Sequence, residues 1–433
     1  MLAIYGLETQ LMSVQRTNWA GNVTYRAARS HEPASLEHLQ QLVADSERVR
    51  PVGTGHSFTA IADTTGDLVS VAALPHLCEV DTERSSVTVA AGLRYGEVTN
   101  HLHRAGYALP SLGSLPHISV AGAIATGTHG SGSSVGSLAT AVSALQMVTA
   151  DGEVVEIDRS ADDDELAGSV VGLGALGVVT RVTLDVVPTF SMRQWVYDDI
   201  PRQSVVDHVE EILASAYSVS LFTDWRRDPF RLLWLKQRVE GGLADPAPPT
   251  RWFGARLAGG PRHPIDGMPV ENCTEQLGTP GPWHTRLPHF RMEYTPSSGR
   301  ELQSEYLLPL EHAAAALEAI AAMRDRIGPL VQTSEIRTVA GDDLWLSPSH
   351  GRDSVAIHFT WVPDTEGVSS VLGPLEEQLA PFSPRAHWGK LSASCHDPSG
   401  RYERYADFAA LMHRFDPAGK LRNELVDRWF PQA

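Results

Sequence analysis

Two glycine-bracketed histidines mark this chain: Gly53-Thr54-Gly55-His56-Ser57-Phe58, and further on Ala121-Gly122-Ala123-Ile124-Ala125-Thr126-Gly127-Thr128-His129-Gly130. Both runs consist mainly of small residues, which allow the backbone to approach a ligand closely. Because glycine lacks a Cβ atom, neighbouring amide N–H groups can converge on an anion and form a nest that suits a pyrophosphate. The two runs therefore predict a site for a phosphate-bearing ligand, with His56 beside it.

The bulk composition indicates a globular chain with more than one domain. Its 433 residues exceed one ordinary core, and 42% hydrophobic with 20% charged residues is typical of folded proteins. The charge is strongly acidic, with 35 basic against 52 acidic residues and a net charge of -17. Such a field opposes nucleic acids and anionic membranes, so we expect neither as a partner, whereas a neutral substrate is compatible with it.

The cysteines bear on metal sites and on the compartment. The chain has three widely separated cysteines, Cys78, Cys273 and Cys395, which form neither a disulfide framework nor a CxxC zinc site. We expect no metal site and a reducing, cytoplasmic location. No apolar run reaches the roughly 20 residues that a membrane helix needs.

Helix and strand signals alternate from Thr17 to about Pro188. Ser35 is a suitable N-cap for a helix that begins at Leu36. Ala150-Asp151-Gly152 predicts a hairpin turn. Strands are predicted at 49–52, 68–71, 87–90, 142–148, 154–157 and 178–187. This block is predicted to be an α+β domain with mixed sheets.

The segment from 189 to 384 differs in composition. Its Pro/Gly-rich stretch, 241–280, predicts a long surface excursion. A helix is predicted from Glu311 to Ile327, ended by Gly328-Pro329. Strands are predicted at 331–339 and 354–361.

One motif imitates a dinucleotide fingerprint. Residues 172–177 read Gly-Leu-Gly-Ala-Leu-Gly and match G-x-G-x-x-G. That fingerprint requires a following helix, whose N-terminus holds the pyrophosphate. The residues that follow, 178–184, have the pattern of a strand, so we predict that this motif is not a Rossmann site.

Two predicted strands carry ionisable groups on one face. Glu335 and Arg337 are separated by one residue, as are His358 and Thr360, so each pair shares a face of its strand. A solvent-facing side of a sheet is one interpretation. The other is a polar wall against a hydroxyl-rich substrate, because each desolvated hydroxyl needs a hydrogen-bond partner. Few lysines and glutamates accompany these residues, which favours the wall.

His56 and Lys390 each allow two interpretations when taken alone. His56 fits a polar turn residue as well as a ligand-bonding ring, and Lys390 fits an ordinary surface charge as well as a member of the polar wall. Spacing does not decide between them.

These residues lie within longer stretches that resemble the alditol oxidases, also called xylitol oxidases, of actinobacterial type. They are vanillyl-alcohol-oxidase-type FAD-linked flavoproteins. The resemblance extends over nearly the whole chain from Thr17 and includes the stretches 17–22, 114–122, 218–225, 295–299, 335–338 and 387–390. Motifs so long and so dispersed are specific.

The resemblance implies a two-domain α+β fold of the vanillyl-alcohol-oxidase type. A mixed-sheet FAD-binding domain would span 14–188, an α+β cap domain would span 189–384, and 385–433 would return to the FAD-binding domain. It also implies FAD bonded covalently through His56. The implied cofactor-binding residues are Pro51, Val52, Gly53, Thr54, Gly55, His56, Ser57, Ser114, Ser119, Gly122, Thr126, Gly127, Thr128, His129, Val179 and His387.

The resemblance further implies oxidation of a terminal polyol alcohol, as in xylitol or sorbitol, to the aldose, with hydride transfer to FAD and reduction of O2 to H2O2. Glu335, Arg337 and Lys390 would be catalytic. The implied substrate-binding residues are Ser114, Glu335, Arg337, His358, Thr360 and Lys390. Gly113 would leave oxygen unobstructed at the flavin, which favours an oxidase over a dehydrogenase. We expect a monomer.

Two other functions remain open from the sequence. A sugar-lactone (aldonolactone) oxidase or dehydrogenase would use the same fold, and a non-catalytic sugar-binding module would be colourless. Two departures from the family pattern are noted: Gly113 stands where relatives often carry alanine, and residues 391–396 do not follow the family. The second departure concerns a loop and not the catalytic residues.

Overall fold

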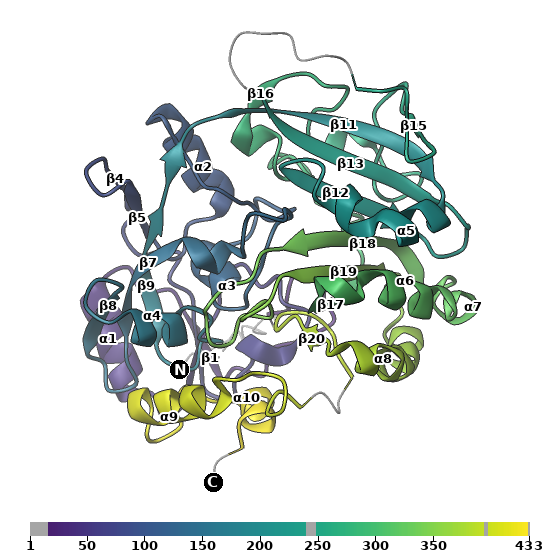
Figure 1. The fold of residues 1–433 in the computed structure, drawn as a ribbon. Coiled ribbons are helices and arrows are strands. Elements are labelled where there is room, and N and C mark those ends of the chain that lie inside the picture. The colour runs from purple at the N-terminus through teal and green to yellow at the C-terminus, as the bar shows by residue number, and fades with distance from the viewer. Residues whose placement is uncertain (1–15, 240–247, 394–396, 432–433) are drawn as a thin grey trace, which may run out of the picture.

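Two large sheets organise the protein. The computed structural model describes residues 16–239, 248–393 and 397–431. A five-stranded sheet lies on one side of Figure 1 and a ten-stranded sheet on the other, and the chain passes from the first to the second through β11 (Ser191–Ile200). Within the described ranges no helix has the length and hydropathy to cross a bilayer.

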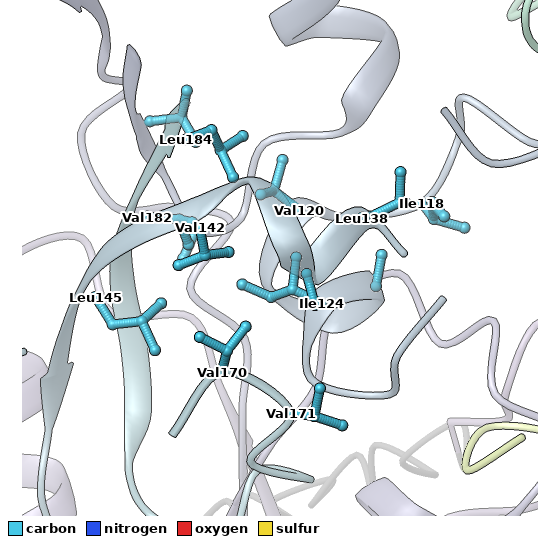
Figure 2. Close-up of a cluster of buried hydrophobic side chains, with 14 of the residues drawn as sticks. Ile118, Val120, Ile124, Leu138, Val142, Leu145, Val170, Val171, Val182 and Leu184 are labelled. Atoms are coloured by element: carbon cyan, nitrogen blue, oxygen red, sulfur yellow. The ribbon is translucent and has the colours of Figure 1, made fainter. Parts of the chain in front are cut away.

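The five-stranded sheet is antiparallel. Its order is β4 (Cys78–Asp81), β5 (Ser86–Ala90), β9 (Val178–Asp185), β7 (Val142–Val148) and β8 (Val154–Asp158). The predicted hairpin turn joins β7 to β8, with Gly152 at a φ of +88° that glycine adopts without strain. Figure 2 shows Val142 and Leu145 of β7 and Val182 and Leu184 of β9 facing Val120 and Ile124 of the short helix α3 (Val120–Ile124).

A small parallel sheet carries the first glycine run. Its order is β1 (Arg29–His31), β3 (Asp67–Val69) and β2 (Val49–Pro51). Helix α1 (Leu36–Asp45) precedes β2 and is capped by Ser35, whose Oγ accepts a hydrogen bond from His38 N at 3.2 Å. A two-stranded ribbon pairs β6 (Tyr107–Ala108) with β10 (Val187–Pro188). Parallel and antiparallel sheets thus coexist, as the sequence predicts.

The ten-stranded sheet is antiparallel throughout. Its order is β14 (Arg251–Trp252), β15 (Ala255–Leu257), β11, β13 (Phe230–Val239), β12 (Ser218–Thr223), β18 (Val331–Val339), β19 (Ser354–Trp361), β17 (Leu302–Pro309) and β20 (Arg385–Ala386), with β16 (Gly281–Pro282) also on β11. In the register of its centre, Glu335 of β18 lies opposite His358 of β19, and His358 lies opposite Glu305 of β17.

Helices cover only one face of this sheet. The core on that side combines α5 (Arg202–Leu213), α6 (Ala313–Ala321) and α8 (Thr365–Leu379) with Ile336 and Ile357 from the central strands (Figure 1). Because strand side chains alternate between faces, Glu335 and Arg337 must point to the opposite side. At the centre of the sheet, the face turned away from these helices is therefore the polar one.

The predicted helix 311–327 is wrong as a continuous element. A 3-10 turn, η5 (Leu310–His312), leads into α6, and α7 (Arg324–Ile327) follows after a break at Ala322 and Met323. An uninterrupted helix would place Arg324 one turn beyond Ile320 on the apolar face. The break buries Met323 there instead and leaves Arg324 exposed.

Two other predicted segments also need correction. Strand 178–187 is interrupted at Val186, where β9 ends and β10 begins after one residue. The stretch 241–280 is not only a surface excursion, since β14 and β15 extend the large sheet and Cys273 is buried. Residues 241–247 of that stretch lie outside the described ranges. So does part of the loop 391–396, on which a departure from the family was noted.

The C-terminal segment is bonded to the N-terminal one through Asn423. Helices α9 (Tyr405–Phe415) and α10 (Glu424–Trp429) pack into the same core as the five-stranded sheet. Asn423 caps α10, and its Nδ2 donates to the carbonyl oxygens of Ala60, Ile61 and Asp63 at 3.0, 3.1 and 2.8 Å. One buried side chain thus closes a contact over more than 350 residues of sequence.

Asn423→Ala should lower the free energy of unfolding by about 2 kcal/mol, because a helix cap is lost and buried carbonyl groups lose their donor. Urea denaturation followed by tryptophan fluorescence measures the change. Glu424→Gln is the control, since this 76% exposed side chain makes a surface ion pair with Arg26 that solvent screens. Equal midpoints for the two variants would contradict the contribution assigned to Asn423.

Candidate active site

A cavity of about 460 Å³ lies between the small-residue loops and the polar face of the ten-stranded sheet. Its size falls in the range of about 300–1,000 Å³ that is usual for small-molecule sites. The first loop, the segment 113–129, the turn 172–179, the strands β17 to β19 and residues 387–390 all contribute to its wall. Segments that are distant in sequence therefore meet at one site.

The two small-residue runs meet each other directly. A Cβ atom on Gly53 would collide with Ser119 Oγ, and one on Gly122 would lie 2.8 Å from the same oxygen. Ser119 N donates to Thr54 Oγ1 at 3.3 Å, which ties the runs together. Gly55 has a φ of +72°, a conformation that favours glycine. The glycines are thus required for a close approach of two backbone segments beside the cavity.

His56 presents an unpaired nitrogen. Its Nδ1 lies 3.0 Å from Thr54 Oγ1, and its ring stacks on Trp19 with centroids 5.2 Å apart and an interplanar angle of 18°. Nε2 is buried and has no hydrogen-bond partner among the described residues. Burial, assisted by the nearby His117, lowers the pKa of His56 to about 4, so the ring is neutral at pH 7.

Gly127 is the exception among the residues predicted to bind a cofactor. It is absent from the cavity wall, and a Cβ atom there would lie 3.0 Å from Pro348 Cδ. Its φ of +64° indicates that it is needed for the turn between Thr126 and Thr128, which do line the cavity. Its prediction as a ligand contact is therefore not supported by its position.

The turn 172–177 lines the cavity although it is not a Rossmann motif. Helix α4 (Asp163–Val170) precedes it and strand β9 follows it, the reverse of the order that the fingerprint needs. Arg50 donates to Leu173 O and Gly174 O at 2.8 Å each and so fixes the turn to the end of β2. Sequence reasoning rejected the motif correctly and missed its place in the wall.

The polar faces of β18 and β19 are buried. Glu335, Arg337, His358 and Thr360 are 5%, 4%, 7% and 3% exposed, which excludes the solvent-facing interpretation. Arg337 Nε lies 3.6 Å from Glu335 Oε1, and its Nη1 donates to Ser114 Oγ at 3.3 Å. The pairs predicted from sequence spacing therefore face one cavity together with Ser114.

Sequence reasoning missed the carboxylate at the centre of the site. Glu305 of β17 is 1% exposed, and its two oxygens accept hydrogen bonds from Arg337 Nη2 and Lys390 Nζ, each at 2.6 Å. His129 Nε2 and His358 Nδ1 lie 3.3 and 3.7 Å from the same carboxylate. These five residues are named the Glu305 cluster below. The available signal was that Gln303 and Glu305 share a face of a strand whose other residues include Leu302 and Tyr306.

Ion pairing decides the ionisation of the cluster. Burial alone would raise the pKa of Glu305, but Lys390, His129 and Arg337 hold it well below its usual value. Burial alone would lower the pKa of Arg337, whereas attraction to Glu335 and Glu305 raises it. Such mutual compensation is what keeps unpaired charge out of a dry interior.

The Lys390 side chain is only 15% exposed, so it is not an ordinary surface charge. Burial lowers its pKa, and attraction to Glu305 offsets part of that effect. Besides Glu305, Nζ contacts His358 Nδ1 at 2.9 Å. Burial and Lys390 together lower the pKa of His358 to about 4, so its neutral ring accepts this bond and turns Nε2–H toward Thr360 Oγ1 at 3.1 Å.

His387 faces the second loop. Its Nδ1 accepts a hydrogen bond from Gly389 N at 3.0 Å, and its Nε2 lies 3.5 Å from Thr128 Oγ1. Burial, then Lys390, lowers its pKa well below the usual value. The remaining predicted residues that line the cavity are Pro51, Val52, Gly53, Thr54, Gly55, Ser57, Ser119, Gly122 and Val179.

Known proteins are similar to this chain over parts of it and over nearly its whole length. Residues 28–158 match the family described as FAD binding domain, and residues 295–429 match D-arabinono-1,4-lactone oxidase. Alditol oxidase of Streptomyces sp. (strain IKD472 / FERM P-14339) is 51% identical over 419 residues, covering 96% of this chain and 99% of that protein.

More distant proteins share the whole length or the fold. L-gulono-1,4-lactone dehydrogenase of Mycobacterium tuberculosis is 29% identical over 442 residues, covering 96% of this chain and 99% of its own. The solved structure of cholesterol oxidase from B. sterolicum superposes with a TM-score of 0.75 at 15% identity and covers 96% of both chains. At that identity the likeness concerns the fold alone.

Glu305→Gln should lower the free energy of unfolding at pH 7 by about 3 kcal/mol, since two buried cations lose their counter-ion. Because the folded pKa of Glu305 is depressed, its contribution is fully present above the ordinary value of 4.5 and is lost as the pH falls below it. Urea denaturation at several pH values should therefore show that the difference in free energy of unfolding between the wild type and Glu305→Gln becomes smaller on acidification.

Glu376→Gln provides the control for that measurement. Burial raises the pKa of Glu376, which accepts hydrogen bonds from Tyr306 Oη at 2.9 Å and Ala393 N at 2.7 Å. A raised folded-state pKa reverses the sign of the pH dependence, so acidification should increase the free energy of unfolding of the wild type relative to Glu376→Gln. The role assigned to the Glu305 ion pairs would be contradicted if the difference in free energy of unfolding between the wild type and Glu305→Gln stayed constant or increased in acid.

Proposed function

The chain belongs to the alditol oxidases, within the vanillyl-alcohol-oxidase-type FAD-linked flavoproteins, and we propose that it oxidises the terminal primary alcohol of a polyol such as xylitol or sorbitol, with O2 reduced to H2O2. One observation carries the proposal. A single cavity has the small-residue loops and His56 on one side and the buried charges of Glu305, Glu335, Arg337 and Lys390 on the other.

The residues present fit a flavin dinucleotide. Gly53, Ser119 and Gly122 line the cavity, and the two glycines approach Ser119 too closely for a Cβ atom, so the wall there is mainly backbone. The residues 51–57, Ser119, Gly122, Thr126, Thr128, His129, Val179 and His387 would hold the cofactor. When bound, FAD supplies a two-electron acceptor that takes a hydride from carbon and passes the electrons to O2.

We place the covalent attachment at His56. A neutral imidazole nitrogen is a nucleophile, and Nε2 is buried, unpaired and neutral at pH 7. Stacking on Trp19 and the contact with Thr54 fix the orientation of the ring. A buried polar atom without a partner is costly, which supports a bond to a ligand at this position.

The charged residues would act on the reacting hydroxyl. Arg337 and Lys390 would donate to its oxygen and ease its deprotonation, and Lys390, whose pKa burial lowers, can hold or release a proton at Nζ. Glu335 would accept a hydrogen bond from a neighbouring hydroxyl, with Ser114, His358 and Thr360 beside it. Glu305 binds both cations and keeps them in position before the substrate enters.

Gly113 supports oxygen as the acceptor. It lines the cavity next to Ser114, and a Cβ atom there would lie 3.6 Å from Ile118 Cδ1, an ordinary contact. An alanine would therefore fit and narrow the wall. Glycine leaves that room for O2.

A lactone oxidase is the second candidate, because residues 295–429 match the D-arabinono-1,4-lactone oxidase family. A peroxide assay of the wild type with xylitol, sorbitol, glycerol and L-gulono-1,4-lactone separates the two. We expect peroxide with the polyols at a higher kcat/KM than with the lactone. The reverse order would favour the second candidate, and a colourless protein would favour a binding module.

The domain division and cellular setting belong to the same proposal. Residues 14–188 with 385–433 would bind FAD and residues 189–384 would form the cap, which the FAD-domain match at 28–158 supports. A reducing, cytoplasmic setting is consistent with Cys78 and Cys273, which are free thiols. The monomeric state stays a prediction.

His56→Ala should abolish covalent attachment while the protein remains folded, because the alanine has no ring nitrogen to bond the flavin. Acid precipitation followed by absorption of the pellet and the supernatant measures this. Yellow colour should stay in the wild-type pellet and in that of His101→Ala, an exposed histidine on α2 (Tyr95–Arg104). Flavin retained in the His56→Ala pellet would contradict the assignment.

Lys390→Met should reduce kcat for xylitol by about 10²–10³-fold, since a donor to the developing alkoxide is lost. Bound flavin, measured by its absorption, should be unchanged. Lys420→Met is the matched control, because Lys420 donates to Val43 O and Ala44 O away from the cavity. Normal turnover by Lys390→Met would remove Lys390 from the proposed chemistry.

A further inference from the structure

A buried hydrogen-bonded chain lies behind Glu335. His289 Nε2 is 2.7 Å from Glu335 Oε1, and Lys236 Nζ of β13 is 3.0 Å from His289 Nδ1. Glu335, His289 and Lys236 are 5%, 4% and 1% exposed. Glu335 and His289 line the cavity, whereas Lys236 lies outside its wall. The hydrogen bonds from Lys236 through His289 to Glu335 therefore connect the protein interior with the site.

The donors and acceptors of this chain have one consistent assignment. Lys236 can donate three hydrogen bonds, and it has three acceptors: Leu287 O at 2.5 Å, Pro288 O at 3.0 Å and His289 Nδ1. Burial lowers the pKa of His289 to about 4, so its ring is neutral at pH 7. Since Nδ1 accepts, the ring proton lies on Nε2 and is donated to Glu335 Oε1.

Apolar surroundings make the burial of Lys236 and His289 unfavourable in free energy. His289 packs edge-on against Trp234 and Phe222, with centroids 5.1 and 5.8 Å apart. A buried ammonium group is destabilising by several kcal/mol unless it is paired. No carboxylate contacts Lys236 directly within the described chain, and burial lowers its pKa to about 7. Apolar packing would have filled this space at lower cost.

These hydrogen bonds leave one carboxylate oxygen of Glu335 available. Its Oε1 is bonded to His289 and lies 3.6 Å from Arg337 Nε. No described residue donates a hydrogen bond to Oε2. The bond to Oε1 restricts rotation of the carboxylate, and Glu335 lines the cavity, so Oε2 is the oxygen left for a ligand.

We propose that Lys236 and His289 are positioning residues, which fix the Glu335 carboxylate so that its second oxygen accepts a hydrogen bond from a hydroxyl of the substrate. This inference rests on the proposed polyol oxidation. It assigns to the β13 strand and to the segment after η4 (Trp283–Thr285) a role in substrate recognition, although Lys236 does not touch the cavity.

The test uses two substitutions that differ by one methylene group. His289→Gln can place its amide N–H near the position of Nε2 and keep the bond to Glu335. His289→Asn is too short and can replace only the contact of Nδ1 with Lys236. His263→Gln is the control, because His263 is 4% exposed, packs on Phe290 with centroids 5.4 Å apart and makes no contact with Glu335.

Steady-state kinetics with xylitol on the flavin-loaded proteins should separate the variants. His289→Asn should raise KM by about tenfold or more, as loss of an orienting partner typically does, with a smaller fall in kcat. His289→Gln should recover most of the wild-type KM, and His263→Gln should equal the wild type. Flavin absorption should be the same in all four.

The outcomes are distinct. Equal KM values for His289→Asn and His289→Gln would overturn the positioning role, whatever their common value. If His289→Asn does not fold, Lys236→Met provides the second variant, and an unchanged KM there would overturn the part assigned to Lys236. A wild type that oxidises no polyol would instead refute the proposed function.

Discussion

The pairing of Glu305 with Arg337 and Lys390 is the constraint on which the site depends. A carboxylate that is 1% exposed needs cations to remain ionised, and both cations have a counter-ion in it. Glu305 comes from β17, Arg337 from β18 and Lys390 from the loop after β20. Electrostatics therefore requires that the two strands and the start of the C-terminal segment come together before the site exists.

The ten-stranded sheet makes this possible by separating its two faces. Apolar residues such as Ile336 and Ile357 meet the helices on one side, and their neighbours in sequence carry the charges on the other. The facing wall is made of backbone and small side chains, where Gly53 and Gly122 approach Ser119. A buried, charged surface thus faces a wall of backbone and small side chains across the cavity, and this combination suits hydride removal from a desolvated alcohol.

Local patterns allowed much of the fold to be predicted from the sequence. Alternation gave β18 and β19 and their polar faces, and the Asp151-Gly152 turn gave the β7–β8 hairpin. Glu305 and His289 were missed because their significance arises from partners 32 and 46 residues away in sequence, Arg337 and Glu335. The break in the helix at Met323 was missed for a similar reason, since it depends on which residues the sheet buries. The motif of residues 172–177 does not predict that they line the cavity, because their position depends on the hydrogen bond from Arg50 to Leu173 O.

The central claim is that this cluster of buried charges holds a polyol for hydride transfer to a flavin in the same cavity. Mixing the wild type with xylitol in the absence of oxygen and following the flavin absorption tests it most directly. The flavin should bleach at a rate that saturates with xylitol concentration, and its colour should return, with formation of peroxide, when air is admitted. A flavin that stays oxidised at every polyol concentration would contradict the claim.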